Sequence, residues 1–127
     1  MIISNFLIIN CIGSDDKLGL RINKDFFIHN FKDNKKNNSL VSEIYIFLKK
    51  HNVTLDEKFT VLVNQGPGSF SGLRISLAVA KGLEISKKIK LYGFKSQDLG
   101  VFNEENIEKL LKKSLTEKNL IKPIYLS

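Results

Sequence analysis

Apolar residues in the first quarter of the chain follow patterns that are typical of β-strands. Residues 6–12 form an almost unbroken apolar run, which indicates a buried strand. Residues 18–22 alternate between apolar and polar side chains, and residues 25–31 form a third segment of the same kind. Short clusters of turn-forming residues separate the three segments. The pattern therefore predicts three strands joined by tight turns, which is an antiparallel meander.

Helical and strand patterns alternate along the rest of the chain. A polar loop at 32–38 is followed by apolar residues at helical spacing over 39–51, with Ser39 as the N-cap. The later segments predict a strand, a helix, a strand and an amphipathic helix at 59–63, 72–86, 89–94 and 104–115. A strand, helix and strand joined in this order form a right-handed parallel crossover. The expected fold class is α/β and leans toward three layers, with a mixed sheet of an antiparallel meander plus parallel strands and with helices mainly on one face.

The helices at 39–51 and 72–86 carry more apolar side chains than one sheet face can cover. A helix that is apolar all round is buried on more than one side. Gly72, Ser76 and Ala80 are spaced by four, so a stripe of small residues would let another helix approach closely. We therefore predict that the two helices lie side by side against a second chain, and that Ser76→Leu or Ala80→Glu breaks association without unfolding the monomer. The alternative is that 72–86 is buried within the chain's own core.

A glycine-rich turn joins the strand at 59–63 to the helix that follows it. Gly66 and Gly68 allow backbone dihedrals that a β-carbon would forbid, and Pro67 fixes one φ between them. Ser69 or Ser71 can cap the helix by accepting a hydrogen bond from a free backbone N–H. The sequence therefore predicts a rigid strand–turn–helix corner.

The same turn differs from the two common phosphate-binding motifs. A P-loop needs Gly-Lys-Ser/Thr at the helix start, whereas Gly72 is followed by Leu73 and Arg74. The dinucleotide fingerprint needs a shorter glycine spacing and an acidic residue after the next strand, and residues 91–94 offer none. A small nucleotide- or phosphate-binding enzyme that uses residues 66–72 stays open as an alternative.

Length and composition are those of one small globular domain. The chain has 127 residues and no apolar run near the ~20 residues that a membrane-spanning helix needs. The N-terminus lacks the features of a signal peptide, and Cys11 is alone, which favours a cytoplasmic protein without disulfides. The net charge of +7 comes mostly from lysine. Compositional drift and a selected anionic partner such as tRNA are both open explanations.

No catalytic constellation emerges from the titratable residues. Cys11 lies in a predicted strand and is expected to be a small buried hydrophobe. His29 and His51 have no acidic residue at metal-ligand spacing, so no metal site is expected. Asp15 and Asp16 are interpreted as turn formers. Arg74 stands at the mouth of the glycine turn, where it is favoured for an interface role over a surface ion pair.

Two consecutive runs identify a family resemblance. Residues 66–75 read Gly-Pro-Gly-Ser-Phe-Ser-Gly-Leu-Arg-Ile, and residues 78–83 read Ala-Val-Ala-Lys-Gly-Leu. Together they closely resemble the signature of the TsaB (YeaZ) family, with Ser71 where that family usually has Thr. Residues 96–99 resemble the start of the family's next helix, and 122–126 resemble its Pro-x-Tyr-Leu-Arg ending.

Other parts of the family pattern are changed. The family's N-terminal Asp-Thr-Ser is replaced by Asn10-Cys11-Ile12, and its His-Ser appears only as Asn38-Ser39. The resemblance implies a single actin/hexokinase-like (ribonuclease H-like) subdomain over residues 1–127, with the family's second subdomain missing and a short C-terminal tail retained.

The resemblance also implies a function. TsaB proteins are the non-catalytic partners of the transferase TsaD, which forms N6-threonylcarbamoyladenosine at position 37 of tRNAs that read ANN codons. The expected partner is therefore a TsaD-like subunit in a heterodimer, with a TsaE-like ATPase as a further candidate and a homodimer left open. ATP and metal are expected only in TsaD, this chain is expected to need no cofactor, and its contact with tRNA is expected to be indirect or weak.

Two residue sets carry these expectations. The signature loop comprises Gly66, Pro67, Gly68, Ser69, Phe70, Ser71, Gly72, Leu73 and Arg74. The expected partner interface comprises Val41, Tyr45, Leu48, Gly72, Ile75, Ser76, Val79, Ala80 and Leu83.

Overall fold

The computed structural model describes residues 5–13, 15–31, 39–113 and 121–124. In these ranges the order of elements is β1 (Phe6–Asn10), β2 (Lys17–Ile22), β3 (Asp25–Asn30), α1 (Leu40–Lys50), β4 (Thr60–Asn64), α2 (Phe70–Lys87), β5 (Lys90–Phe94), α3 (Ser96–Leu99) and α4 (Glu104–Lys112). Every strand and helix predicted from the sequence is present, with ends shifted by a few residues at most wherever the structure describes them.

The five strands form one mixed sheet with the order β3-β2-β1-β4-β5. β1 pairs antiparallel with β2, and β2 pairs antiparallel with β3, which confirms the predicted meander. β4 lies parallel to both β1 and β5, so α2 is the crossover helix between two parallel neighbours. The strand predicted at 59–63 is therefore interior, and β1 occupies the middle of the sheet.

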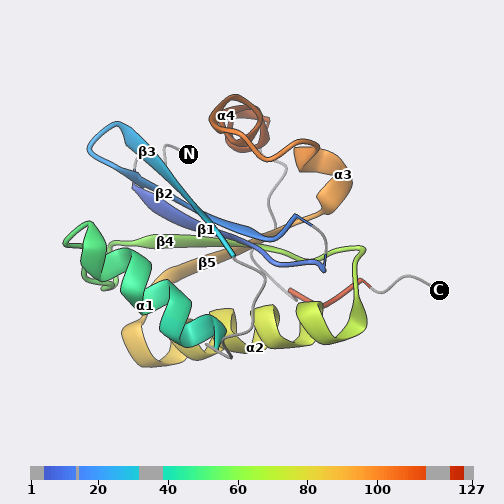
Figure 1. Cartoon of the computed structure of the whole chain (residues 1–127), viewed down its shortest axis with the longest axis horizontal. Coiled ribbons are helices and arrows are strands. Elements are labelled where there is room, and N and C mark those ends of the chain that lie inside the picture. The colour runs from blue at the N-terminus through green and yellow to red at the C-terminus, as the bar shows by residue number, and fades with distance from the viewer. Residues whose placement is uncertain (1–4, 14, 32–38, 114–120, 125–127) are drawn as a thin grey trace.

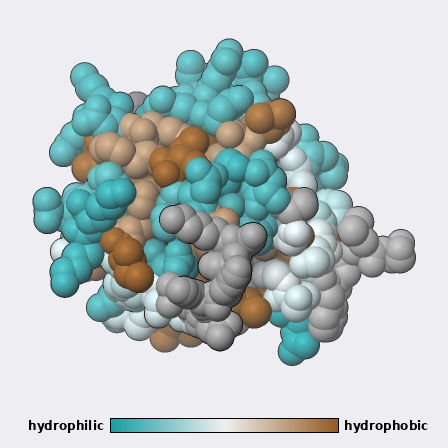
Figure 2. All heavy atoms as spheres, viewed as in Figure 1, coloured by the Kyte–Doolittle hydropathy of each residue, from teal (hydrophilic) through white to brown (hydrophobic). Residues whose placement is uncertain are grey.

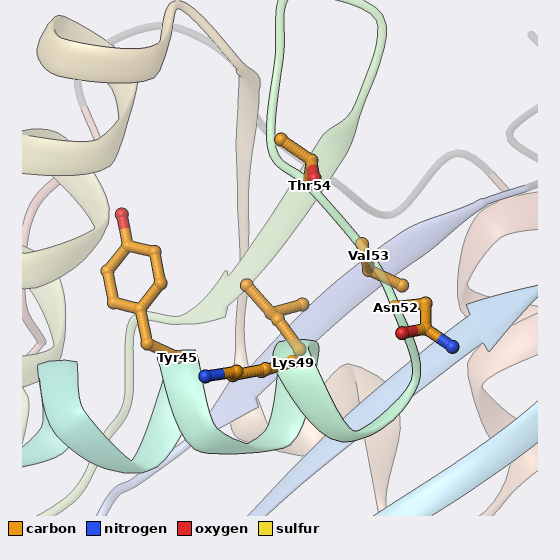
Figure 3. A pocket seen from close by; sticks show the side chains of 6 residues that line it. Tyr45, Lys49, Asn52, Val53 and Thr54 are labelled. Atoms are coloured by element: carbon orange, nitrogen blue, oxygen red, sulfur yellow. The ribbon is translucent and has the colours of Figure 1, made fainter.

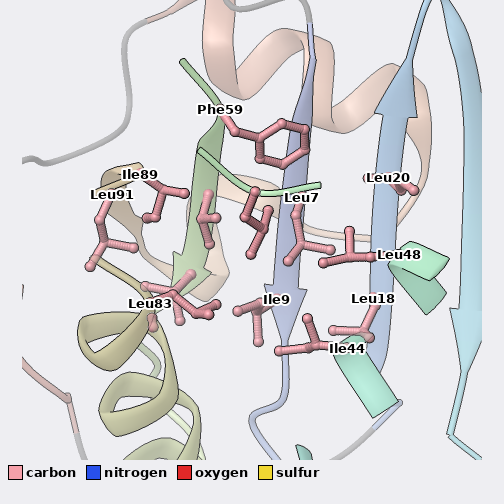
Figure 4. Close-up of a cluster of buried hydrophobic side chains, with 14 of the residues drawn as sticks. Leu7, Ile9, Leu18, Leu20, Ile44, Leu48, Phe59, Leu83, Ile89 and Leu91 are labelled. Carbon is pink, nitrogen blue, oxygen red and sulfur yellow. The ribbon is translucent and has the colours of Figure 1, made fainter. Parts of the chain in front are cut away.

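The larger hydrophobic core lies between the sheet and the pair α1 and α2 (Figure 1). Figure 4 shows Leu7 and Ile9 of β1 and Leu18 of β2 pointing toward Ile44 of α1 and Leu83 of α2. The two helices also contact each other, so the prediction that they lie side by side is confirmed. Alternate residues of each strand enter this core because successive side chains point to opposite faces.

The opposite face of the sheet is covered by α3 and α4, which makes the domain three-layered (Figure 1). Phe6 and Ile8 of β1 pack there against Ile107 and Leu110 of α4. The two long helices lie on one face, as expected, and the shorter α3 and α4 form the third layer toward which the expected fold leaned. Both faces of β1 are fully buried, so a second helical layer has to cover the side that α1 and α2 leave open.

An ion-pair cluster fixes α4 on this second face. The Arg21 guanidinium on β2 lies 2.8 Å from Glu104 Oε2, and it also pairs with Glu108. The same guanidinium lies 5.4 Å from the centre of the Phe6 ring. Because Arg21 is largely buried while both carboxylates stay partly exposed, the cluster closes the edge of the smaller core.

Local side chains define where the helices begin. The Ser39 hydroxyl accepts a hydrogen bond from Ser42 N, and Ser69 Oγ accepts one from Gly72 N. Asn103 caps α4 in the same way, through Asn106 N. These caps satisfy donors that the first turn of a helix leaves free.

Some sequence expectations lie outside the described residues. They are the polar loop at 32–38, the end of the last helix at 115, and tail residues 125–127. Across the ranges that the structure does describe, no helix combines the length and the hydropathy that crossing a membrane requires.

Candidate functional site

The signature loop forms the corner between β4 and α2, at the carboxyl end of the parallel strands. Ser69 is the N-cap of α2, whereas Ser71 lies within the helix and is exposed. Ser69 N also donates to Ile12 O at 2.8 Å, which ties the corner to the segment after β1. The sequence left both serines open as caps, and the structure assigns the role to Ser69.

Two glycines of the loop are required by contacts between distant segments. Gly66 has φ +106°, and a β-carbon there would collide with the carbonyl oxygen of Ile124. A β-carbon on Gly68 would lie 2.6 Å from Ile12 O. The glycines therefore let the C-terminal segment and the β1–β2 connection approach the loop backbone.

A network of buried polar side chains forms hydrogen bonds to the start of the signature loop. Asn64 Nδ2 donates to Asn10 Oδ1 at 2.7 Å, and Asn64 Oδ1 accepts from Gly66 N at 2.7 Å. The Ser96 hydroxyl lies 3.1 Å from Asn64 Oδ1 and 3.3 Å from Pro67 O. The sequence pattern does not predict this network. Its only signal there is an Asn that ends each of two apolar runs.

The C-terminal segment seals the other side of the loop. Ile124 N donates to Gln65 O at 2.7 Å, and Gln65 Nε2 donates to Lys122 O at 3.1 Å. Ile121 is buried in the larger core. The tail motif and the signature loop, which are far apart in the sequence, thus form one structural unit.

The backbone donors of the loop are largely used within the chain. Gly66 N, Ser69 N, Gly72 N and Leu73 N all donate to protein oxygens. A phosphate cradle needs such N–H groups free to face the ligand. The geometry therefore favours a structural corner over a phosphate site.

The other candidate groups also have structural roles. Cys11 is 7% exposed, which confirms it as a buried small residue, and burial with a smaller effect of Asp16 raises the pKa of its thiol well above the ordinary range. Asp16 Oδ1 accepts from Gly13 N at 2.9 Å, and Asp15 pairs with Lys17, as expected of turn formers.

Neither histidine joins a metal-binding group in the described part of the chain. His29 Nε2 lies 2.6 Å from Glu43 Oε1, and His51 stacks on Phe27 with ring centres 3.9 Å apart. Within the described ranges, no group of three or more His, Cys, Asp or Glu side chains could hold a metal ion. His29 and His51 join β3 to α1.

The structure divides the expected partner interface into two groups. Five of its residues keep some solvent exposure: Val41, Tyr45, Gly72, Ile75 and Val79. The other four are buried in the chain's own core: Leu48, Ser76, Ala80 and Leu83. The small stripe of Gly72, Ser76 and Ala80 therefore turns inward at its last two positions, and it lets α2 approach its own sheet instead of a partner helix.

The outward side of α2 carries a different stripe. Its five residues are exposed, uncharged and spaced by four and three: Ser71, Ile75, Ala78, Gly82 and Ile85. Ile75 is 54% exposed and Ile85 is 78% exposed. A β-carbon on Gly82 would meet no atom of the described residues within 4 Å, so the space beside Gly82 is open in this part of the chain. The sequence contained the spacing, but only the placement of the sheet shows which side of α2 faces outward.

A pocket of about 410 Å3 opens beside α1. Figure 3 shows Tyr45 and Lys49 on α1, with Val53 and Thr54 on the segment that leads to β4. Its complete lining is Tyr45, Leu48, Lys49, Asn52, Val53 and Thr54. Tyr45 belongs both to this pocket and to the exposed part of the expected interface.

Other apolar side chains are exposed away from α2. In Figure 2, brown residues gather between the helix at the top, α4, and α1 below it, over the edge of the sheet. Ile28 on the edge strand β3 is 43% exposed, and Ile46 on α1 is 56% exposed. Exposed isoleucines are thus not confined to α2. What distinguishes α2 is the regular spacing of its five uncharged, exposed residues.

Comparisons with known proteins give consistent results. The family model described as "TsaD: tRNA N6-adenosine threonylcarbamoyltransferase" matches residues 34–119. The protein TsaB for tRNA threonylcarbamoyladenosine biosynthesis from Buchnera aphidicola subsp. Schizaphis graminum is 28% identical over 106 residues, which cover 80% of this chain and 49% of that protein. TsaB from subsp. Baizongia pistaciae is 48% identical over 46 residues, which cover 36% of this chain and 21% of that protein. The chain spans about half the length, or less, of these curated relatives.

Solved structures show the same fold. YeaZ from Pseudomonas aeruginosa superposes with a TM-score of 0.66 at 18% identity, over 88% of this chain and 50% of that chain. A second structure, an uncharacterized protein with similarity to peptidase YEAZ from Pseudomonas aeruginosa, also has a TM-score of 0.66 at 18% identity and covers 87% and 49%. The likeness in fold to these structures therefore covers most of the chain.

Proposed function

The chain belongs to the TsaB/YeaZ family, and from this premise we propose that it is a non-catalytic subunit of tRNA threonylcarbamoyladenosine synthesis that binds a TsaD-type transferase. The proposed contact surface is the outward stripe of α2, extended on α1 by Val41 and Tyr45. The proposed location is the cytoplasm. The free thiol of Cys11 fits the reducing environment there.

The observation that carries the proposal is the spacing of the outward stripe of α2. Its residues recur at intervals of four and three, which is the repeat by which two helices pack along a shared seam. Fully burying an isoleucine side chain contributes about 1.5–3 kcal/mol, so Ile75 and Ile85 together represent a substantial gain for a docked complex. Within the length of the stripe, the exposed charged residues of α2, Arg74, Lys81 and Glu84, lie beside it and not at its positions.

Gly82 supports the same proposal. Glycine inside a helix destabilises a protein by roughly 0.5–1 kcal/mol relative to alanine. At Gly82 none of the residues that the structure describes requires the missing side chain, because the space around it is open. A partner helix that approaches closely at this position would give the glycine a role.

The non-catalytic part of the proposal rests on the structural roles of the candidate groups. Cys11 is a buried thiol, Asp15 and Asp16 form a turn, and His29 pairs with Glu43. In the alternative function the signature loop would bind a nucleotide, but four of its N–H groups, those of Gly66, Ser69, Gly72 and Leu73, donate within the chain. In this proposal the transferase partner binds ATP and metal, and this chain alone binds no cofactor.

The test is association with a TsaD-type subunit, measured by sedimentation velocity for the chain alone and for the mixture. Ile75→Glu should weaken the heterocomplex at least tenfold, because it places a charge in the seam. Val101→Glu is the matched control, since Val101 is 70% exposed but lies between α3 and α4 on the other face.

Three outcomes separate the proposals. Selective weakening by Ile75→Glu supports the proposed surface. Unchanged association of Ile75→Glu, with folding confirmed by circular dichroism, would place the interface elsewhere. Self-association that Ile75→Glu abolishes, without any binding to the transferase, would assign the stripe to a homodimer instead. A TsaE-like ATPase, added last, would test the further partner.

A further inference from the structure

Six exposed lysines gather at one end of the domain. Figure 1 shows that α1 and α2 end on the same side, where β4 and β5 begin. The lysines lie at these four ends: Lys49 and Lys50 on α1, Lys58 before β4, Lys87 and Lys88 on α2, and Lys90 on β5. They come from three separate segments of the chain, so only the fold brings them together.

The sheet register fixes part of this cluster. Thr60 pairs with Lys90, and Lys90 N donates to Phe59 O at 2.9 Å. Lys58 lies two residues before Thr60, and Lys88 lies two residues before Lys90. By this register Lys58 and Lys88 occupy equivalent positions before the neighbouring strands β4 and β5. Both side chains are exposed at the start of neighbouring strands.

None of the six lysines has an ion-pair partner among the described residues. Several carboxylates elsewhere are paired, with Glu104 and Glu108 held by Arg21 and Asp15 held by Lys17. The positive charge of this end is thus not neutralised by contacts within the described chain.

A purely structural explanation covers only part of the cluster. Basic side chains in the last turn of a helix stabilise the helix dipole, which accounts for Lys49, Lys50 and Lys87. It does not account for Lys58, which precedes β4, or for Lys90, which is the first residue of β5. Three exposed acidic residues, Asp56, Glu57 and Glu84, lie on the same segments and leave an excess of positive charge.

We propose that this lysine end binds the phosphate backbone of a structured RNA. Lysine presents a compact point charge that suits phosphate contacts, and such contacts position a nucleic acid without reading its sequence. The cluster lies at the ends of the helices, whereas the outward stripe of α2 runs along its side. The two surfaces adjoin, because Ile85 lies two residues from Lys87 and because Tyr45 and Lys49 line one pocket. The choice of RNA over an acidic protein rests on the proposed function, in which the substrate is a tRNA, and it replaces the expected indirect contact with a direct one.

The test uses the full chain and a fluorescein-labelled, unmodified tRNA transcript, with affinity measured by fluorescence anisotropy over a range of salt concentrations. The variant Lys58→Gln/Lys87→Gln/Lys90→Gln removes three charges from the cluster. The matched control, Lys95→Gln/Lys112→Gln/Lys113→Gln, removes three exposed lysines from the region of α3 and α4. For every phosphate that the variant no longer neutralises, the slope of log K against log salt should become shallower by about 0.9.

We expect the affinity of the cluster variant for tRNA to fall at least tenfold with a shallower salt slope, while the control stays within twofold of wild type. Equal decreases in both variants, or no change in the cluster variant, would overturn the proposal. Displacement of the tRNA by polyglutamate at equal charge concentration would instead indicate a surface for an acidic protein.

The assay also separates this inference from the proposed function. Ile75→Glu should bind tRNA like wild type, and the cluster variant should associate with the transferase like wild type. If the transferase does not bind but the tRNA does, the proposed partner surface fails while the lysine end stands.

Discussion

Asn64 donates its side-chain amide to Asn10 Oδ1 at 2.7 Å, across the carboxyl ends of the parallel neighbours β4 and β1. Asn64 is 1% exposed and Asn10 is 6% exposed, so neither amide can exchange its partner for bulk water. The same Asn64 accepts from Gly66 N and thereby positions the first glycine of the signature loop. The corner that begins α2 is thus held by side chains of two central strands.

We predict that Asn64→Ala strongly destabilises the domain. The change leaves Asn10 Oδ1 and Gly66 N without their partners, and each buried polar group without a partner costs about 1–3 kcal/mol. Urea denaturation should show a lower midpoint with an unchanged slope. Asn30→Ala on the exposed end of β3 is the control and should stay within about 0.5 kcal/mol of wild type. Equal stability of Asn64→Ala and wild type would contradict the structural role of the network.

Substitution of two glycines by alanine should have opposite effects. Gly82→Ala should raise the free energy of unfolding by roughly 0.5–1 kcal/mol, because alanine favours the helix and the space is open. Gly66→Ala should lower it, because φ is +106° and the new β-carbon would collide with Ile124 O. Thermal unfolding of both variants checks the signs. Two changes of the same sign would be inconsistent with the described environments.

Ser76→Leu tests the inward orientation of the small stripe. The spacing in the sequence predicts that this change breaks association and leaves the monomer folded. Because Ser76 is 0% exposed, the structure instead predicts overpacking that destabilises the monomer by about 1–3 kcal/mol. Ala78→Leu, on the exposed side of α2, should change stability little. Chemical denaturation of the isolated chain distinguishes the two variants, and a fully stable Ser76→Leu would favour the prediction from spacing.

Cys11 should resist alkylation in the folded protein at pH 8. Iodoacetamide reacts with the thiolate, and burial raises the pKa of Cys11 far above the ordinary value of about 8.5, so the thiol stays protonated. Raising the pH toward about 9 should leave the folded rate low, whereas unfolding in urea should restore ordinary reactivity. Mass spectrometry of the labelled fraction measures this. Rapid labelling under native conditions would show that the thiol is accessible.

The sequence by itself determined the elements and their order. Alternation and apolar runs indicated the strands, Ser39 identified one helix start, and Ser69 or Ser71 marked another. The signature loop identified the family. These signals depend on residues that are close together along the chain. The turn roles of Asp15 and Asp16 could be predicted for the same reason, because their partners lie within three residues in the sequence.

Only the tertiary structure decided what depends on contacts between distant segments. It placed α4 on the second face through Arg21 and turned Ser76 and Ala80 toward the chain's own core. It also joined Ile124 to the signature loop through Gln65. A helix that is apolar all round gives no information about which side meets the sheet, because the periodicity is satisfied in every direction. The orientation is fixed only when the sheet is in place to bury one side and leave Ile75 and Ile85 in water.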